Sequence, residues 1–228
     1  GNPADMESII SIAYKHNIKI IEDAAQAHGA KDINDNHIGS FSDLSCFSFY
    51  PGKNLGCYGD GGMIITNNKK HFLKLRKLRN MGQEVKNIHT EIGFNSRLDT
   101  IQAVLLSMKL KRLNYQNNKR KKLAKLYDLN LTNKKIIKIK YSKNSVYHQY
   151  VIMIKDRKKL SKILSSKNIQ YGIHYPTSIN KIDCFKKIFK GKKFINAETI
   201  AQKCLSLPID PNLSLSSHRK ICNILNRF

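Results

Sequence analysis

The sequence predicts an α/β protein in which a larger domain precedes a smaller one. Short apolar segments typical of strands alternate with amphipathic helical segments, an acidic pair follows one strand, and a lysine and a glycine-rich turn follow another. The chain has 228 residues, of which 41% are hydrophobic, so it can bury a substantial core. The pattern changes near Thr132, and we therefore expect one domain over residues 1–131, including a long linking helix, and a small one over 132–228.

The first helix should span Met6 to about His16, because Asp5 is a suitable N-cap and apolar residues follow at helical spacing. A short strand, Ile18 to Ile21, follows and leads into Glu22-Asp23-Ala24-Ala25-Gln26-Ala27-His28-Gly29-Ala30. Ligands of α/β proteins bind at the carboxyl ends of strands, so Asp23 is a candidate site residue. The alternative is that Asp23 caps a helix with Gln26 as its N3 partner, and these residues alone leave both interpretations open.

The central motif is a buried strand, Leu44 to Phe49, that ends at Pro51 and Gly52 and delivers Lys53 just past the break. A glycine-rich turn and a second strand, Met63 to Thr66, follow. Among aromatic and glycine residues the ammonium of a lysine is poorly solvated, and the neutral amine is the nucleophile that forms Schiff bases. The alternative is a solvated turn lysine, which is the usual case in a chain this rich in lysine.

The remaining elements follow from the same patterns. A basic helix should run from Lys69 to Arg79 after an Asn67-Asn68 turn, and a long helix should run from Leu98 to about Leu129 after a polar loop. In the smaller domain we expect strands at Val146–Ile154 and Gln170–Tyr175, and helices at Asp156–Lys167, Asn196–Leu205 and Ser217–Leu225.

The chain is strongly basic, with 41 Lys and Arg against 16 Asp and Glu and a formal net charge of +25. An excess of positive charge of this size is typical of proteins that bind nucleic acid. The lysines are scattered, however, and isoleucine and asparagine are also abundant, so we interpret the charge as compositional drift and expect no specific nucleic-acid partner.

The cysteine and hydropathy patterns indicate which kinds of stabilising site and which cellular environment to expect. The five cysteines are odd in number and form no CxxC pair, which argues against a disulfide framework and a metal site and fits a reducing cytoplasm. No apolar run reaches the ~20 residues of a membrane span, so we expect no membrane association. The chain begins at Gly1 directly before a helix, and we expect it to be the C-terminal part of a longer protein.

Three residues together suit one cofactor, pyridoxal 5'-phosphate. Its pyridine nitrogen must stay protonated to serve as an electron sink, which a carboxylate such as Asp23 favours. Its aldehyde needs an amine such as that of Lys53, and its phosphate needs donors such as the hydroxyl of Ser48. Each type occurs at the predicted end of a strand or just past it.

Longer motifs around these residues occur in a fixed order. They are the segments 22–30, 48–56 (Ser-Phe-Tyr-Pro-Gly-Lys-Asn-Leu-Gly), 59–62 (Gly-Asp-Gly-Gly), 93–99 (Gly-Phe-Asn-Ser-Arg-Leu-Asp), 147–150 (Tyr-His-Gln-Tyr) and 172–176 (Gly-Ile-His-Tyr-Pro). In this order the chain resembles, from end to end, the DegT/DnrJ/EryC1/StrS sugar aminotransferases. The resemblance implies a fold-type-I pyridoxal-phosphate-dependent transferase: a partial large domain with a mixed, mostly parallel sheet, and a smaller C-terminal α/β domain.

The same resemblance implies a role for each residue that matches a family motif. Lys53 would be the Schiff-base lysine and would shuttle a proton between the cofactor carbon and the bound amine. Asp23 would pair with the pyridinium nitrogen, Gln26 would lie near the phenolic oxygen of the ring, and Ser48 would bind the phosphate.

Further residues are implied to act on the neighbouring subunit or on the substrate. The family's asparagine at Asn95 reaches the phosphate from the other subunit, which implies a homodimer with composite sites. His174 and Tyr175 would lie near the sugar nucleotide. His28 is a third substrate candidate, with simple packing as its alternative.

The reaction implied is transfer of an amino group, with glutamate the usual donor, to a keto group of a nucleotide-linked deoxysugar for surface polysaccharide or related glycans. Related sugar dehydratases carry histidine in place of the lysine, so Lys53 indicates transamination. Family members carry a long upstream part that also contributes to the site. The alternatives are an inactive truncated remnant of such an enzyme and a basic nucleic-acid-binding protein.

Overall fold

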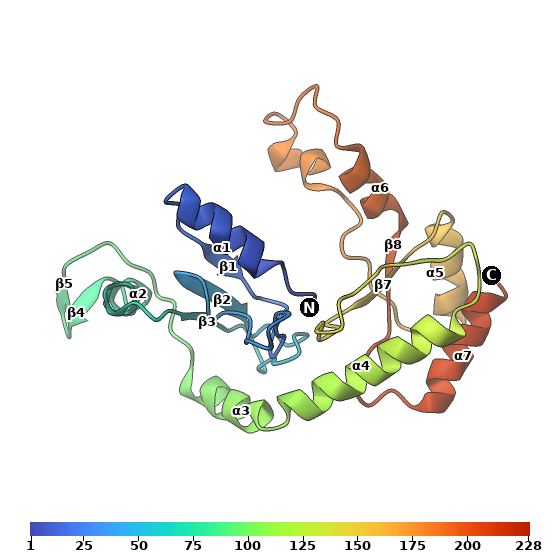
Figure 1. Ribbon diagram of the computed structural model, residues 1–228, viewed down its shortest axis with the longest axis horizontal. Helices are drawn as coiled ribbons and strands as arrows, with labels where there is room; N and C mark the ends of the chain where they lie inside the picture. Colours follow the sequence, from blue (N-terminus) through green and yellow to red (C-terminus); the bar gives the residue numbers. More distant parts are fainter. The chain divides into compact units, whose positions relative to one another are not determined.

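The computed structural model describes residues 1–228, which form two compact units (Figure 1). The first unit comprises residues 1–118 and 142–148, and the second comprises residues 119–141 and 149–228. Each unit combines a sheet with helices, so the predicted α/β class is confirmed. These compact units are defined by their internal contacts, whereas the expected domains, 1–131 and 132–228, are parts of the chain that would fold independently. That division stays a prediction.

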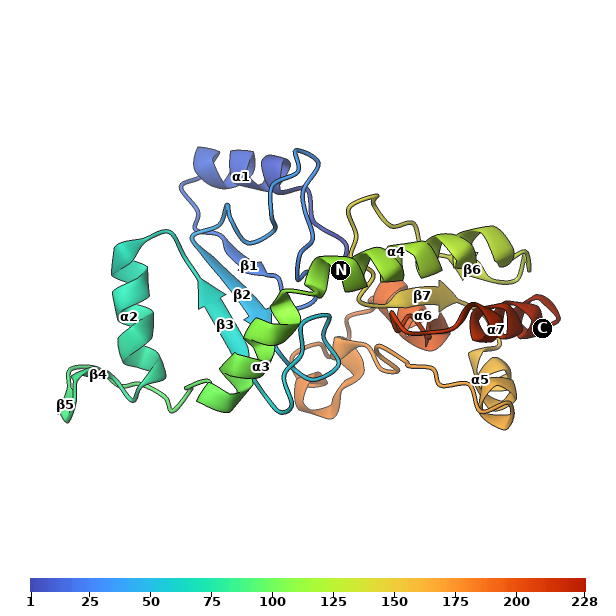
Figure 2. The ribbon, with the colours of Figure 1, turned by 90° about the horizontal axis from the view of Figure 1, so that it is seen from below.

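The sheet of the first unit has the order β1-β2-β3, with strands Ile21–Asp23, Leu44–Ser48 and Gly62–Ile65 side by side (Figure 2). β1 and β2 are parallel and β2 and β3 antiparallel, so the sheet is mixed as predicted. β1 begins where the expected strand Ile18–Ile21 ends. The amide of Ile20 donates to the carboxylate of Asp43 (3.0 Å) instead of to a neighbouring strand.

Two helices of this unit begin at the residues that the sequence indicates. α1 (Met6–Lys15) starts after Asp5, whose carboxylate accepts from the amide and hydroxyl of Ser8 at 3.2 and 2.7 Å. α2 (Lys69–Arg79) starts after Asn68, whose side chain accepts from the amides of the second and third helical residues.

Two expectations for the following segment are wrong in detail. The polar loop after α2 contains a hairpin, β4 (Gln83–Val85) and β5 (Ile88–His89), with Asn87 at a positive φ in its turn. The long helix expected over Leu98–Leu129 is two helices, α3 (Thr100–Leu110) and α4 (Leu113–Asn130). At the break, the amide of Arg112 bonds to the carbonyl of Lys109, three residues back.

The core of the first unit consists of two clusters. Their buried members are Met6, Ala24, Ala30, Ile38 and Val146 in one, and Phe49, Leu55, Cys57, Leu106 and Leu113 in the other. The first cluster includes Val146 because segment 142–148 returns to this unit. The expected strand Val146–Ile154 is therefore shorter, and only its second half forms β7.

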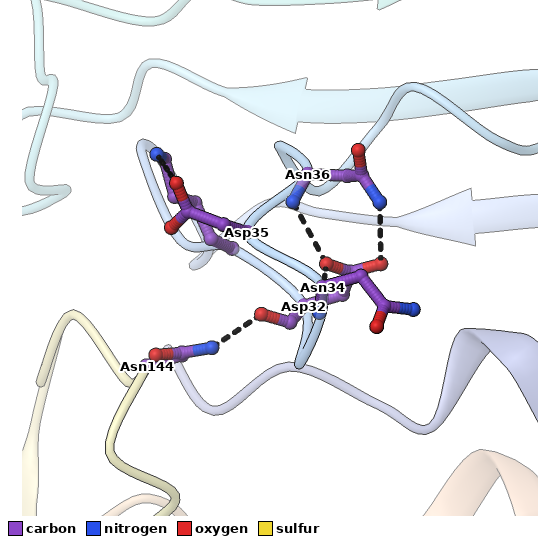
Figure 3. Close-up of polar contacts among 6 residues, drawn as sticks. Asp32, Asn34, Asp35, Asn36 and Asn144 are labelled. Atoms are coloured by element: carbon purple, nitrogen blue, oxygen red, sulfur yellow. Dashed lines mark hydrogen bonds and ion pairs between the residues drawn. The ribbon is translucent and has the colours of Figure 1, made fainter.

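Segment 142–148 is fixed to the loop between β1 and β2 (Figure 3). The side-chain amide of Asn144 donates to the carbonyl of Asp32. The carboxylate of Asp32 in turn accepts from the amides of Asn34 (2.9 Å) and Asn36 (2.8 Å), which holds the loop in a tight turn. The bond from Asn144 thus attaches a sequence-distant segment to this loop.

The second unit is built on an antiparallel sheet, β6 (Ile137–Lys138), β7 (Tyr150–Met153) and β8 (Cys204–Leu207). All four residues of β8 are buried, so it lacks the alternation that marks a strand, and the sequence assigned part of it to a helix. That helix, α6, covers only Ile195–Lys203. The expected strand Gln170–Tyr175 is reduced to a single bridge between Gly172 and Ser206.

Helices α5 (Arg157–Ser166) and α7 (Leu215–Asn226) match the predicted helices closely, and two short 3₁₀ turns cover Ile179–Lys181 and Asp183–Phe185. Tyr127 lies at the centre of this core, with its ring centroid 4.8 Å from that of Tyr150 and 4.1 Å from that of His218. Its hydroxyl donates to the carbonyl of Pro208 (2.9 Å). None of the helices combines the length and apolar character that crossing a bilayer requires.

Truncation of one core side chain of α5 tests this packing. Leu164 is fully buried, whereas Lys162 on the same helix is exposed. Leu164→Ala should lower the free energy of unfolding by about 2–5 kcal/mol, because it leaves a cavity. Lys162→Ala should change it by no more than about 0.5 kcal/mol. Urea unfolding monitored by circular dichroism measures both, and equal effects would contradict the assigned core.

Candidate active site

The residues that follow β2 form a closed turn, residues 49–57, which we call the lysine turn. The amide of Phe49 donates to Gly61 (2.7 Å), and the amide of Cys57 returns to the carbonyl of Phe49 (2.8 Å). Inside this loop the amide of Lys53 donates to the carbonyl of Tyr50 (2.9 Å). The ends of the turn therefore meet, and Lys53 lies near its tip.

Close packing explains a glycine in this turn. A Cβ on Gly56 would overlap the backbone carbonyl of Pro51, so only glycine fits there. The carbonyl of Gly56 accepts from the ammonium of Lys109 (2.6 Å). Just past the turn, the amide of Tyr58 donates to the side-chain oxygen of Gln102 (2.8 Å). Both partners belong to α3, which thus supports the turn from one side.

Lys53 is half-buried, and its surroundings change its titration. Burial lowers the pKa of the Lys53 amine below its usual value, and the negative charge of Asp23 opposes this effect. The charge of Asp23, at the end of β1, therefore acts on Lys53, which lies in the turn after β2. The net result is an amine that loses its proton more readily than a solvated lysine does.

Asp23 is the last residue of β1 and is exposed. Its carboxylate accepts from the amide of Ala25 (3.0 Å), but the residues that follow form turns and no helix. The helix-capping interpretation, with Gln26 as the N3 partner, is therefore wrong. Gln26 lies half-buried in these turns.

Ser48 ends β2 at the same edge of the sheet as Asp23, because the two strands are parallel and Asp23 pairs with Cys46. The hydroxyl of Ser48 accepts from the amide of Tyr50 (3.3 Å). This bond leaves the hydroxyl hydrogen for another acceptor. The structure thus brings an amine, a carboxylate and a hydroxyl to one edge of the sheet.

His28 lies in the core. It is 3% exposed, with its ring centroid 5.4 Å from that of Phe47 and 5.9 Å from that of Phe49. Burial lowers its pKa to about 4, so the imidazole is neutral near pH 7. This environment favours the packing interpretation, and the role of His28 in substrate binding stays a prediction.

Asn95 is exposed in the segment that joins β5 to α3. This segment runs beside the end of α2: the amide of Phe94 donates to the carbonyl of Leu78 (2.7 Å), and Arg97 donates to the side chain of Asn80 (3.1 Å). Asn95 is thus presented at the surface of the first unit. Its expected action in a neighbouring subunit stays a prediction.

The two expected substrate residues lie in the second unit. The ring of His174 is held by Ser206, whose hydroxyl lies 2.9 Å from Nδ1, and it meets the ring of Tyr175 edge-on at 5.6 Å. Tyr175 is 68% exposed. Their approach to the lysine turn, which belongs to the other unit, stays a prediction.

Sequence reasoning missed a basic cavity of about 770 Å³ beside α2 and the β4–β5 hairpin. Five cationic residues line it: Arg76, Lys77, Arg79, Lys86 and Arg97. The one lining carboxylate, Glu84, is paired with Lys77 (2.8 Å). Such a cavity attracts anions such as phosphates. The cluster of basic residues at helical spacing in α2 is the signal that could have indicated it.

Comparison with known proteins places these motifs in context. The profile of the DegT/DnrJ/EryC1/StrS aminotransferase family matches residues 1–226. A dTDP-3-amino-3,6-dideoxy-alpha-D-galactopyranose transaminase of Aneurinibacillus thermoaerophilus is 40% identical over 230 residues, which cover 100% of this chain and 63% of the relative. A UDP-N-acetyl-3-dehydro-alpha-D-glucosamine 3-aminotransferase of Acidithiobacillus ferrooxidans is 37% identical over 232 residues, covering 100% and 62%.

Solved structures have the same fold. DesV of Streptomyces venezuelae, in complex with a ketimine intermediate, superposes with a TM-score of 0.92 at 34% identity, over 99% of this chain and 62% of that one. A DegT DnrJ EryC1 StrS aminotransferase from Brucella abortus gives 0.90 at 33%, over 99% and 61%. The chain thus spans less than two thirds of the length of each protein that it matches here.

The interaction between Asp23 and Lys53 can be tested by removing the carboxylate. Asp23→Asn should lower the pKa of Lys53 further, because the charge that favours its ammonium form is lost. The pH dependence of Lys53 modification by an amine-reactive reagent, read by mass spectrometry of its peptide, gives this pKa. Asp35→Asn, in the loop that follows, is the matched control and should leave it unchanged. A pKa that rises in Asp23→Asn would contradict the assigned interaction.

Burial of His28 predicts a loss of stability in acid. The unfolded state takes up a proton near the ordinary pKa of 6.5, whereas the folded state does so only near 4. The contribution is therefore fully present above pH 6.5 and is lost as the pH falls toward 4. His28→Leu should show a smaller loss of stability over this range in urea unfolding, and the surface control His16→Gln should show the wild-type loss. An unchanged slope in His28→Leu would mean that His28 has its ordinary pKa in the folded state as well, and would contradict the assigned burial effect.

Proposed function

Because this chain belongs to the DegT/DnrJ/EryC1/StrS aminotransferase family, we propose that it is the lysine-bearing part of a pyridoxal-phosphate-dependent aminotransferase that acts on a nucleotide-linked sugar. The observation that carries the proposal is the lysine turn, which presents an amine of lowered pKa beside Asp23. The chain spans less than two thirds of the length of its relatives, so the proposed activity is that of a whole protein of the relatives' length.

The residues at this edge of the sheet fit pyridoxal phosphate. Lys53 would bind it covalently through its ε-amine, Asp23 would keep the pyridine nitrogen protonated, and Ser48 would donate to the phosphate. Gln26 would lie near the phenolic oxygen. When bound, the cofactor supplies the electron sink that stabilises a carbanion next to the transferred nitrogen.

Lys53 has a second task once its amine is released. Because the pKa of Lys53 is lowered, its amine gives up its proton more readily than a solvated lysine does, and the neutral nitrogen can accept a proton from a carbon atom and return one. The closed turn limits the movement of the Lys53 backbone, and this reduces the conformational entropy that the side chain loses when it reaches that atom.

The proposed substrates are a nucleotide-linked deoxysugar with a keto group and an amino donor, with glutamate as the usual donor in this family. The relatives named above are transaminases of dTDP- and UDP-linked sugars. His174 and Tyr175 are proposed to contact the sugar nucleotide. We assign the product to surface polysaccharide or related glycans, and the enzyme to the reducing cytoplasm on account of its free cysteines.

The proposed enzyme is a homodimer in which Asn95 serves the cofactor of the other subunit. Asn95 is exposed on the first unit, which suits a contact with a second chain. An amide binds phosphate oxygens without bringing a further charge that must be desolvated. A two-fold dimer would contain two such sites, each built from both chains.

The covalent role of Lys53 is the first test. The natural-length protein should take up pyridoxal phosphate with visible absorbance, and borohydride should fix the cofactor to Lys53, as found by peptide mass spectrometry. Lys53→Ala should lose the adduct and all turnover, whereas the neighbouring-turn variant Lys31→Ala should keep both. An adduct on another lysine would refute the assignment, and no adduct in the wild-type protein would favour an inactive remnant.

The shared site can be tested by mixing two inactive variants. Lys53→Ala and Asn95→Asp should each be nearly inactive alone, but a mixed dimer should contain one intact site. With random pairing about half of the dimers are mixed, so activity should recover to roughly a quarter of normal at most. If Asn95 serves its own subunit, every site carries one lesion, and proven mixed dimers will show no recovery.

A further inference from the structure

A buried pair of asparagines lies directly behind the lysine turn. Asn54, the residue after Lys53, is 8% exposed, and Asn117, on the first turn-and-a-half of α4, is 3% exposed. The side-chain amide of Asn54 donates to Oδ1 of Asn117 (2.9 Å) and to the backbone carbonyl of Val146 (3.0 Å). Both hydrogens of this amide are therefore used.

The chain of hydrogen bonds continues on both sides of this pair. The amide of Asn117 donates to the backbone carbonyl of His28 (2.9 Å), in the segment that starts at Asp23. Nδ1 of His148 lies 3.3 Å from Oδ1 of Asn54. All of these groups belong to the first unit. Asn54 thus ties the backbone next to Lys53 to the 22–30 segment and to segment 142–148.

Only an amide suits this position. Leucine has a similar size but would leave Oδ1 of Asn117 and the carbonyl of Val146 buried without donors. Aspartate would place a carboxylate against the same two oxygens. A buried polar network that is fully paired fixes one arrangement, and the loss of one member loosens it.

We propose that Asn54 is a positioning residue that fixes Lys53 relative to the segment carrying Asp23, through Asn117 and the carbonyl of His28. The inference rests on the proposed function, because it matters only if Lys53 and Asp23 act on the same molecule. Lys53 must reach a defined atom, and misplacement of a catalytic group by 1 Å can cost about a hundredfold in rate. The turn itself is closed at its ends, and this pair fixes where the closed turn lies.

The burial of Lys53 depends on the same packing. If the turn moves away from α4, water reaches the amine and the pKa of Lys53 should rise toward its usual value, because desolvation is the main cause of its lowering. This gives a readout that needs neither cofactor nor substrate.

The test compares Asn54→Ala with Asn144→Ala in the natural-length protein. Asn144 is a matched control, because its amide also attaches segment 142–148 to the first unit, yet its partner is Asp32 in the loop between β1 and β2 (Figure 3). Thermal unfolding, the pKa of Lys53 from its modification by an amine-reactive reagent, and kcat and KM are measured for each. If Asn54→Ala fails to fold, Asn117→Ala breaks the same chain one step away.

Both variants should unfold at lower temperature than the wild type. Only Asn54→Ala should raise the pKa of Lys53 and lower kcat by about ten- to a hundredfold, with KM changed less than about threefold. Asn117→Ala should repeat this pattern, and the double variant should be little worse than either single one. The proposal would be overturned if the pKa of Lys53 and kcat in Asn54→Ala matched those in Asn144→Ala. Additive losses in the variant that combines Asn54→Ala with Asn117→Ala would also overturn it. A wild-type protein without a cofactor adduct at Lys53 would refute the proposed function, while the pKa comparison would still decide the role of Asn54.

Discussion

Backbone closure of the lysine turn is the constraint on which the rest of the site depends. Phe49, the first residue after β2, donates to Gly61 and accepts from Cys57, so the turn begins and ends at the same point, next to the end of this strand. Gly56 makes this closure possible, and α3 supports it through Lys109. A lysine on an open loop would be solvated, and its amine would keep its usual proton.

The electrostatics of the site follow from this placement. Burial disfavours the ammonium of Lys53, and the carboxylate of Asp23 favours it, with burial the larger effect. An aminotransferase needs both: an amine that can be neutral and a fixed negative charge for the cofactor. The parallel pairing of β1 with β2 supplies this combination, since it brings the ends of the two strands to the same edge.

The sequence could predict the parts of the site that depend on local patterns. Asp23 and Ser48 are the last residues of β1 and β2, Lys53 follows β2 in the lysine turn, and turn residues mark where these strands end. The strand β8 could not be predicted, because burial on both faces removes its alternation and a helical pattern runs into it. The bond from Asn54 to Asn117 joins residues 63 positions apart, and no local pattern marks either one. The expected role of Asn95 depends on a second subunit, and those of His174 and Tyr175 depend on how the second unit is placed. Local sequence patterns determine neither.

Native-state hydrogen exchange of the lysine turn tests this account most directly. The amides of Lys53 and Cys57 are bonded within the closed turn, as those of β2 are bonded within the sheet. Amides in a rigid core exchange only when the whole domain unfolds, whereas amides of mobile segments exchange by local opening. The account predicts that both turn amides exchange as slowly as those of β2. Exchange as fast as that of the exposed β4–β5 hairpin would show that the turn opens on its own, and that closure does not hold Lys53 in place.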